Sequence, residues 1–178
     1  MSAAVALTAV PAGAAPVGAA RAGAPAPACA TGWGSLPKSA SSGSSAPLTD
    51  VRAGRHDCFD RMVVEVPGTG KGLGHRVRYV DRVVQDGSGR AVAVRGGAVL
   101  EVRVAAPAHD DAGQPSYPAV AGGPLPGVNL AGYRTFRDAR FVGSFEGETQ
   151  IGLGVRARLP FRVLTLTDRV VVDVAHGW

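Results

Sequence analysis

The sequence lacks any apolar run long enough to cross a membrane. Pro11, Pro16 and Arg21 interrupt the only candidate, and a membrane-spanning helix needs roughly 18 to 20 consecutive apolar residues. No segment keeps a 3.6-residue apolar period either, which argues against amphipathic helices. These absences exclude a transmembrane segment and leave an all-β fold class as the expectation.

Lysine is nearly absent as well. It occurs only at Lys38 and Lys71, so arginine carries almost all of the positive charge. GC-rich coding favours Arg, Ala, Gly and Val, and this accounts for part of the bias. The formal net charge is +5, an excess that helps to attract anionic polymers without choosing among them. With 178 residues, the chain has the length of one domain of ordinary size.

The first 28 residues are mostly Ala, Gly, Pro and Val, with too few large side chains to pack a core, and Arg21 is their single charge. Residues 3–10 form a short apolar segment, and Ala26–Ala28 has the small-x-small pattern that signal peptidases accept. We therefore interpret residues 1–28 as a signal-like leader of a secreted or envelope-associated, extracytoplasmic protein. Because no Lys or Arg precedes the apolar segment, a clipped start, a weak intact signal and a disordered tail remain alternatives.

The chain has only two cysteines, Cys29 and Cys58. Two cysteines in an exported chain usually pair, so we predict a disulfide that pins residues 29–47 to the folded body. Acylation of Cys29 is disfavoured, because a lipobox needs Leu or a similar residue where this chain has Ala26. The Ser- and Gly-rich stretch Ser39–Ser45 predicts a flexible linker rather than a strand or helix.

From Leu48 onward, apolar residues alternate with polar ones, which is typical of half-buried strands. The alternating segments are residues 61–66, 76–79, 99–104, 151–158, 161–166 and 170–174. Turn-forming residues at Asp86–Gly89 and Thr167–Asp168 separate some of them, and Pro107–Gly127 predicts a long surface loop. Residues 48–178 are therefore predicted to form a single β-sandwich, with a small barrel as the alternative.

The patterns that could carry catalysis each have a simpler interpretation. Gly68–Gly74 lacks the Walker spacing and a following helix, so it predicts a hairpin loop rather than a phosphate site. Adjacent ligands such as His109–Asp111 rarely converge on one ion, so a solvated loop is favoured. Glu146 and Glu148 could form a glycosidase pair, but a wet strand edge is favoured. Arg55–Asp57 has no nucleophile beside it. We predict no enzyme, cofactor or metal site.

The second half of the domain is rich in arginine and aromatic residues. Arginine binds carboxylates and phosphates bidentately, and aromatic rings stack on sugar faces, which indicates a glycopolymer-binding surface. The candidate ligand-binding residues are Tyr133, Arg134, Arg137, Arg140, Arg156, Arg158 and Arg162. In the competing interpretation, Phe136, Phe141 and Phe145 are core and the arginines only keep the outer face soluble. Nucleic acid is not expected, because an exported protein with a disulfide rarely meets it.

Several ordered blocks carry a family resemblance. The run Asp50–Val64 (DVRAGRHDCFDRMVV) resembles the opening of the AMIN-like domain found in exported proteins and lipoproteins of high-GC Gram-positive bacteria. Further blocks resemble the same family in the same order, at residues 79–81, 86–89, 143–147, 152–155, 160–163 and 171–176. The resemblance spans about Leu48 to Trp178. It implies a β-sandwich related to the AMIN modules that help localise amidases and secretion components to the cell wall, and it carries over no catalytic residue.

We therefore expect a monomeric, non-enzymatic binding module of the cell envelope that contacts peptidoglycan or an associated anionic glycopolymer. One alternative is a protein-interaction module that recruits an envelope enzyme or assembly factor by strand addition. A less favoured alternative is a wall-acting hydrolase that uses Glu146 and Glu148.

Overall fold

The computed structural model describes Cys29 and residues 32–178, so the predicted leader, residues 1–28, lies outside the described residues. The described part of the chain is all β, and none of it forms a helix long and apolar enough to span a membrane. Its strands are β1 (Lys38–Ala40), β2 (Asp50–Arg55), β3 (Phe59–Glu65), β4 (His75–Val80), β5 (Val83–Val84), β6 (Ala91–Val92), β7 (Ala98–Val104), β8 (Phe136–Phe145), β9 (Glu148–Val155), β10 (Phe161–Leu166) and β11 (Arg169–Ala175).

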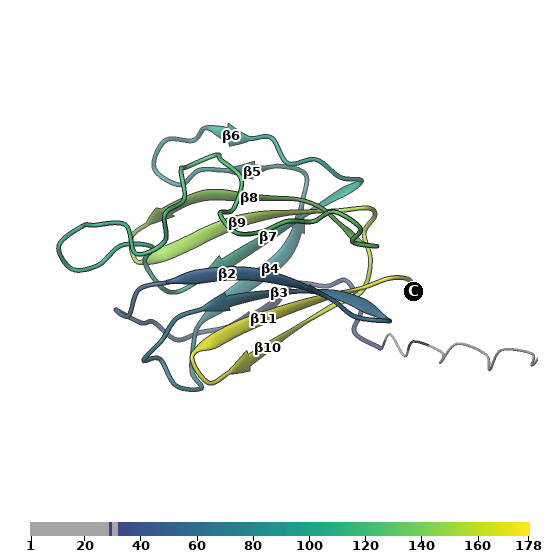
Figure 1. Ribbon diagram of the computed structural model, residues 1–178, viewed down its shortest axis with the longest axis horizontal. Coiled ribbons are helices and arrows are strands. Elements are labelled where there is room, and N and C mark those ends of the chain that lie inside the picture. Colours follow the sequence, from purple (N-terminus) through teal and green to yellow (C-terminus); the bar gives the residue numbers. More distant parts are fainter. Residues whose placement is uncertain (1–28, 30–31) are drawn as a thin grey trace, which may run out of the picture.

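Two antiparallel sheets face each other and enclose the core (Figure 1). The larger sheet has the order β1-β4-β7-β9-β8, and the smaller has the order β10-β11-β3-β2. The strands therefore form two separate layers rather than a closed barrel, which confirms the predicted sandwich.

The core follows from the period-two pattern. On β7, Leu100 and Val102 point inward from the five-stranded sheet, while Met62 and Val64 on β3 point inward from the opposite sheet, and all four are fully buried. The alternate residues on these strands face outward or into local polar networks. Burying apolar side chains from both layers supplies the main stabilising free energy of the fold.

Strand β8 was not among the predicted strands. Its register with β9 shifts between Phe136 and Asp138 and again between Phe141 and Gly143, so its apolar residues do not keep a period of two. The predicted loop Pro107–Gly127 forms no named strand. Part of this loop lies along the free edge of β8, where the amide of Gly122 donates to the carbonyl of Phe141 at 2.7 Å. This contact covers an edge that would otherwise expose unpaired backbone groups.

A small hairpin, β5–β6, packs on the outer side of the five-stranded sheet (Figure 1). Val83 and Val92 of the hairpin bury their side chains against Val142 of β8. The predicted turn Asp86–Gly89 closes this hairpin, and Gly87 and Gly89 there have positive φ angles of 75° and 67°. Thr167–Asp168 likewise joins β10 to β11, as predicted.

Two predicted connections differ from the structure. Ser39 and Ala40 were expected in a linker but form part of β1, because their backbone pairs with the edge of β4. Gly68–Gly74 was expected to be a hairpin loop, but it joins β3 to β4, which belong to different sheets. A Cβ atom at Gly74 would lie 1.8 Å from the carbonyl oxygen of Ser42. Glycine there lets the N-terminal segment pass close to the loop.

Candidate functional site

One end of the sandwich is organised around the fully buried carboxylate of Asp60, the second residue of β3. Its Oδ2 atom accepts hydrogen bonds from the amides of Thr135 at 2.6 Å and Phe136 at 3.0 Å. The hydroxyl of Thr135 donates to the carbonyl of Ala175 at 3.2 Å. These bonds tie the start of β8 to the start of β3 and the end of β11. Because a buried carboxylate requires hydrogen-bond donors, Asp60 fixes how the two sheets meet at this end.

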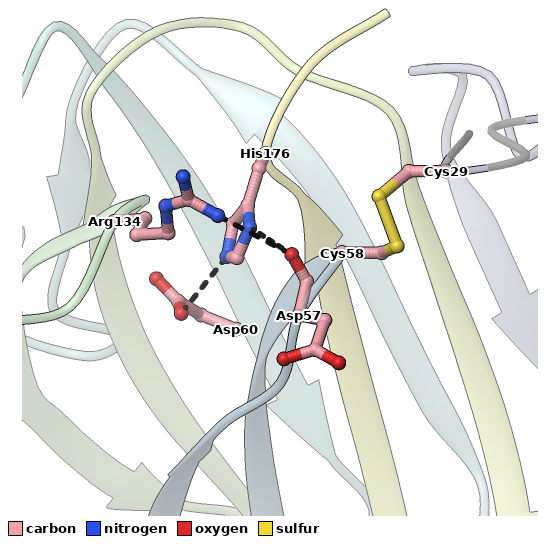
Figure 2. The surroundings of a disulfide bond; sticks show 6 residues. All are labelled: Cys29, Asp57, Cys58, Asp60, Arg134 and His176. Atoms are coloured by element: carbon pink, nitrogen blue, oxygen red, sulfur yellow. Dashed lines mark hydrogen bonds and ion pairs between the residues drawn. A yellow bond between two sulfur atoms is a disulfide. The ribbon is translucent and has the colours of Figure 1, made fainter. Parts of the chain in front are cut away.

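His176 extends this network to the surface (Figure 2). Its Nε2 atom lies 3.1 Å from Oδ1 of Asp60, and its Nδ1 atom lies 3.1 Å from the carbonyl oxygen of Asp57. Both partners are hydrogen-bond acceptors, so each contact is a hydrogen bond when the facing ring nitrogen carries a proton. The imidazole therefore joins the turn between β2 and β3 to the C-terminal segment.

Five exposed arginines surround this network, and we call the region the arginine end. Its arginines are Arg55, Arg134, Arg137, Arg156 and Arg158. Three of their guanidinium groups donate to backbone carbonyls. Arg134 donates to Asp57 at 3.4 Å, Arg156 donates to His176, and Arg137 donates to Tyr133 at 3.0 Å and to Phe136 at 2.9 Å. Carbonyl oxygens orient a guanidinium but leave its full positive charge in place.

Ion pairing distinguishes the arginine end from the rest of the protein. In the described part of the chain, none of its five arginines forms an ion pair. The arginines that do are Arg52, Arg61, Arg78, Arg95, Arg103, Arg140, Arg162 and Arg169. Three other described arginines have no carboxylate partner. Arg76 lies on β4 and Arg90 lies before β6, whereas Arg82 follows the end of β4 on the side of the arginine end. Uncompensated positive charge is therefore concentrated at one end of the sandwich.

Aromatic side chains lie beside these arginines. The ring of Tyr133 stacks on Phe136 with a centroid distance of 5.8 Å. Burial and the nearby carboxylate of Asp60 raise the pKa of Tyr133 above its ordinary value, so its hydroxyl stays neutral. Trp178 is 74% exposed, and its indole nitrogen donates to the carbonyl of Arg158 at 3.2 Å. The surface therefore presents both guanidinium groups and an exposed ring.

The structure brings together five of the seven residues predicted from the sequence: Tyr133, Arg134, Arg137, Arg156 and Arg158. It places the other two on opposite outer faces of the sandwich, where each forms an ion pair. Arg140 on β8 contacts Asp138 at 3.0 Å, and Arg162 on β10 contacts Asp173 at 2.8 Å.

Sequence reasoning missed two members of the arginine end. Arg55 was considered only as part of a possible catalytic run, although its Nη1 atom would lie 3.0 Å from a Cβ on Gly132. Trp178 follows the last strand as an isolated aromatic residue. Its position outside any alternating apolar segment is the sequence feature that could have indicated an exposed ring.

The predicted disulfide joins Cys29 to Cys58 (Figure 2). It holds the N-terminal segment against the outer face of the four-stranded sheet, where Trp33 packs edge-on against Phe59 at 5.6 Å. The guanidinium of Arg162 lies 4.4 Å from the centroid of Trp33. The disulfide prediction is confirmed, and the contacts show which surface the pinned segment covers.

The candidate catalytic and metal-binding residues of the sequence lie in a loop, in a turn and at the start of a strand. Oδ1 of Asp110 accepts from the amides of Ala112 and Gln114, which shapes the loop. Glu146 lies in the turn between β8 and β9 with a φ angle of 48°, whereas Glu148 begins β9. Among the described residues, no three His, Cys, Asp or Glu side chains gather as metal ligands.

The chain is similar to a known protein family. The model of the family described as AMIN-like domain matches residues 46–176. That range includes every strand from β2 to β11 and most of the arginine end, and leaves out β1. No curated protein and no solved structure matches the chain significantly.

Proposed function

The chain belongs to the AMIN-like domain family, and on that premise we propose that it is a non-enzymatic cell-envelope module whose arginine end contacts peptidoglycan or an associated anionic glycopolymer. The family suggests a peptidoglycan-associated binding module in general and an extracytoplasmic place. The disulfide between Cys29 and Cys58 suits an oxidising compartment. Beyond what the family suggests, the protein is secreted and its ligand is anionic.

The observation that carries the proposal is the concentration of arginines without carboxylate partners. A guanidinium already paired with a carboxylate must lose that pair to bind a ligand anion, whereas those of Arg134, Arg137 and Arg156 need not. Their backbone contacts also reduce the entropy that ligand binding would cost. A phosphate or carboxylate polymer can bridge several such groups, and Trp178 offers a ring for a sugar face.

The side chains at the arginine end that could take part in catalysis are hydrogen-bonded within the fold, which supports binding rather than cleavage. Asp60 and His176 hydrogen-bond within the fold, and the hydroxyl of Thr135 is buried and donates to a backbone carbonyl. A hydrolase would need a nucleophile or an activated water within reach of a base and a substrate. At the arginine end, Asp60, His176 and Thr135 instead form hydrogen bonds that join strands.

Co-sedimentation of the purified protein with insoluble cell wall tests the proposal. Binding should fall as salt is raised, because salt screens attraction between exposed charges. It should also fall when the anionic polymers are removed from the wall. Absence of sedimentation under all of these conditions would refute wall binding and leave a protein partner as the better explanation.

A protein-interaction role is the second candidate, and the four-stranded sheet favours it. Its outer strands are β2 and β10, and Leu166 on β10 is 44% exposed. The unpaired backbone of an edge strand can accept a strand from another chain. Capture of an envelope protein that is insensitive to salt and survives Arg156→Ala and Arg158→Ala would favour this role over polymer binding.

A further inference from the structure

A cavity of about 360 Å³ lies at the opposite end of the five-stranded sheet. Its walls are the last residues of β8, the first residues of β9, the turn between β5 and β6, and the loop before β8. Strand β8 begins at the arginine end and finishes at this cavity, and its ten residues span about 30 Å at the usual rise of a strand. The two regions are therefore separate surfaces.

Gln150 is a buried residue that supplies a free acceptor atom to this cavity. Its side chain is only 3% exposed, and its Nε2 atom donates to Oε1 of Glu101 at 2.7 Å. Because the amide nitrogen must face the carboxylate, the orientation of the amide is fixed. Its Oε1 atom accepts no hydrogen bond from the described part of the chain. Because Gln150 lines the cavity and its Oε1 is not among the fully buried atoms, this oxygen is accessible and can accept a hydrogen bond from a ligand there.

The charged side chains that line the cavity are both acidic, Asp86 and Glu148. Arg103 lies behind them and pairs with both, but its Nη1 atom is 3.4 Å from Glu148, a long contact. The hydrogen bonds from Arg103 hold the pKa of Asp86 below its ordinary value, so this carboxylate stays charged. Glu148 has a side chain 46% exposed and can accept further bonds. No Lys or Arg lines the cavity, so an anionic ligand is disfavoured.

Aromatic side chains form another part of the wall. Phe141 and Tyr117 are buried with their rings 6.2 Å apart, and Phe145 is 46% exposed at the edge of the cavity. Phe145 packs against Gly87, where a Cβ atom would lie 3.2 Å from its ring. Aromatic rings next to acidic acceptors suit a ligand with a hydrocarbon stem and a cationic tip.

We propose that this cavity binds a primary ammonium group on an aliphatic stem, such as the side chain of a lysine-like amino acid. The ammonium donates to the carboxylate of Glu148 and to Oε1 of Gln150, and the stem lies against Phe145. This site is independent of the proposed polymer contact, because it uses none of the residues of the arginine end.

Isothermal titration calorimetry with Nα-acetyl-lysine N-methylamide tests the proposal on the intact protein. The matched ligand control is Nα-acetyl-norleucine N-methylamide, which keeps a hydrocarbon side chain but has no ammonium. The lysine compound should bind at least tenfold more tightly than the norleucine compound. Equal affinity for the two, preference for the neutral one, or no heat from either up to millimolar concentration would overturn the proposal.

Two variants locate the site. Glu148→Gln should weaken binding of the lysine compound about tenfold or more, since it removes the carboxylate while keeping the shape of the side chain. Glu146→Gln removes a carboxylate two residues away in the turn, outside the cavity lining, and should leave affinity within about twofold. Equal loss in both variants would show a diffuse charge effect and contradict the site.

Discussion

Two glycines of β9 lack the Cβ atoms that would prevent the segment after β6 from packing on the five-stranded sheet. A Cβ atom at Gly154 would lie 1.8 Å from the carbonyl oxygen of Arg95, and one at Gly152 would lie 2.8 Å from Val94. Glycine at these positions lets the segment after β6 approach the five-stranded sheet at backbone distance. The sequence shows these glycines as the polar face of a strand, whereas the structure shows them as contact points for a third layer.

We predict that Gly154→Ala lowers the free energy of unfolding by about 1–3 kcal/mol, because a backbone carbonyl must move to admit the methyl group. Gly54→Ala on β2 is the matched control, since its Cβ atom would meet only His56 at 3.8 Å. Urea unfolding measures both. A cost for Gly54→Ala equal to that for Gly154→Ala would contradict the packing explanation.

Protonation of Glu101 should lower the stability of the protein in acid. It is 3% exposed, and burial alone would raise its pKa. Hydrogen bonds from Arg78 and Gln150 and the charge of Arg103 outweigh burial and hold the pKa below its ordinary value of 4.5. The stabilisation is therefore complete above pH 4.5 and is lost as the pH falls through the lower pKa of the folded state.

We predict that Glu101→Gln destabilises the protein clearly at pH 7 and much less at pH 3. Denaturant unfolding at the two pH values measures this difference. An equal loss at both would show that the charge of Glu101 contributes nothing and that only its shape is needed.

At the scale of elements, the strands that keep a strict period of two were predicted from the sequence and β8 was not. The two register shifts of β8 put Phe136 and Phe141 in the core, whereas Phe145 is exposed. The interpretation that these phenylalanines are core is thus right for two of the three. The bulges of β8 arise from its contacts with β9 and with the loop along its free edge. A local sequence pattern does not contain those contacts.

The pairing of arginines also required the structure. Arg140 and Arg162 look in the sequence like their neighbours Arg137 and Arg158, yet each faces a buried aspartate. Asp138 is close in sequence to Arg140, but Asp173 reaches Arg162 only because β10 pairs with β11. Which arginines remain available to a ligand depends on such long-range pairs.

The disulfide should act at the level of the N-terminal segment. The loop between Cys29 and Cys58 spans 29 residues, and closing a loop of this length restricts the unfolded chain by roughly 3–4 kcal/mol. We predict that the double variant Cys29→Ser, Cys58→Ser loses about this much stability. Treatment with reductant should bring the native protein to the same value and leave the variant unchanged; a variant as stable as the native protein would contradict the prediction.

For the whole molecule, the two ends of the sandwich carry different chemistry. The arginine end offers cations and an exposed indole ring, and the cavity at the opposite end offers acceptors and aromatic rings. The sandwich keeps the two surfaces apart, so changes at one should leave the other intact. A polymer contact and an amine contact can then be measured separately on the same protein.

Two triple variants with the same loss of charge test the central claim most directly. One changes Arg134, Arg137 and Arg156 to Gln, and the other changes Lys71, Arg76 and Arg90, which lie away from the arginine end, to Gln; none of the six forms an ion pair in the described part of the chain. Co-sedimentation with cell wall at low salt should fall about tenfold or more for the first and stay within about twofold of the native protein for the second. Equal losses would show that net charge alone drives binding, and unchanged binding by the first variant would refute the arginine end as the contact surface.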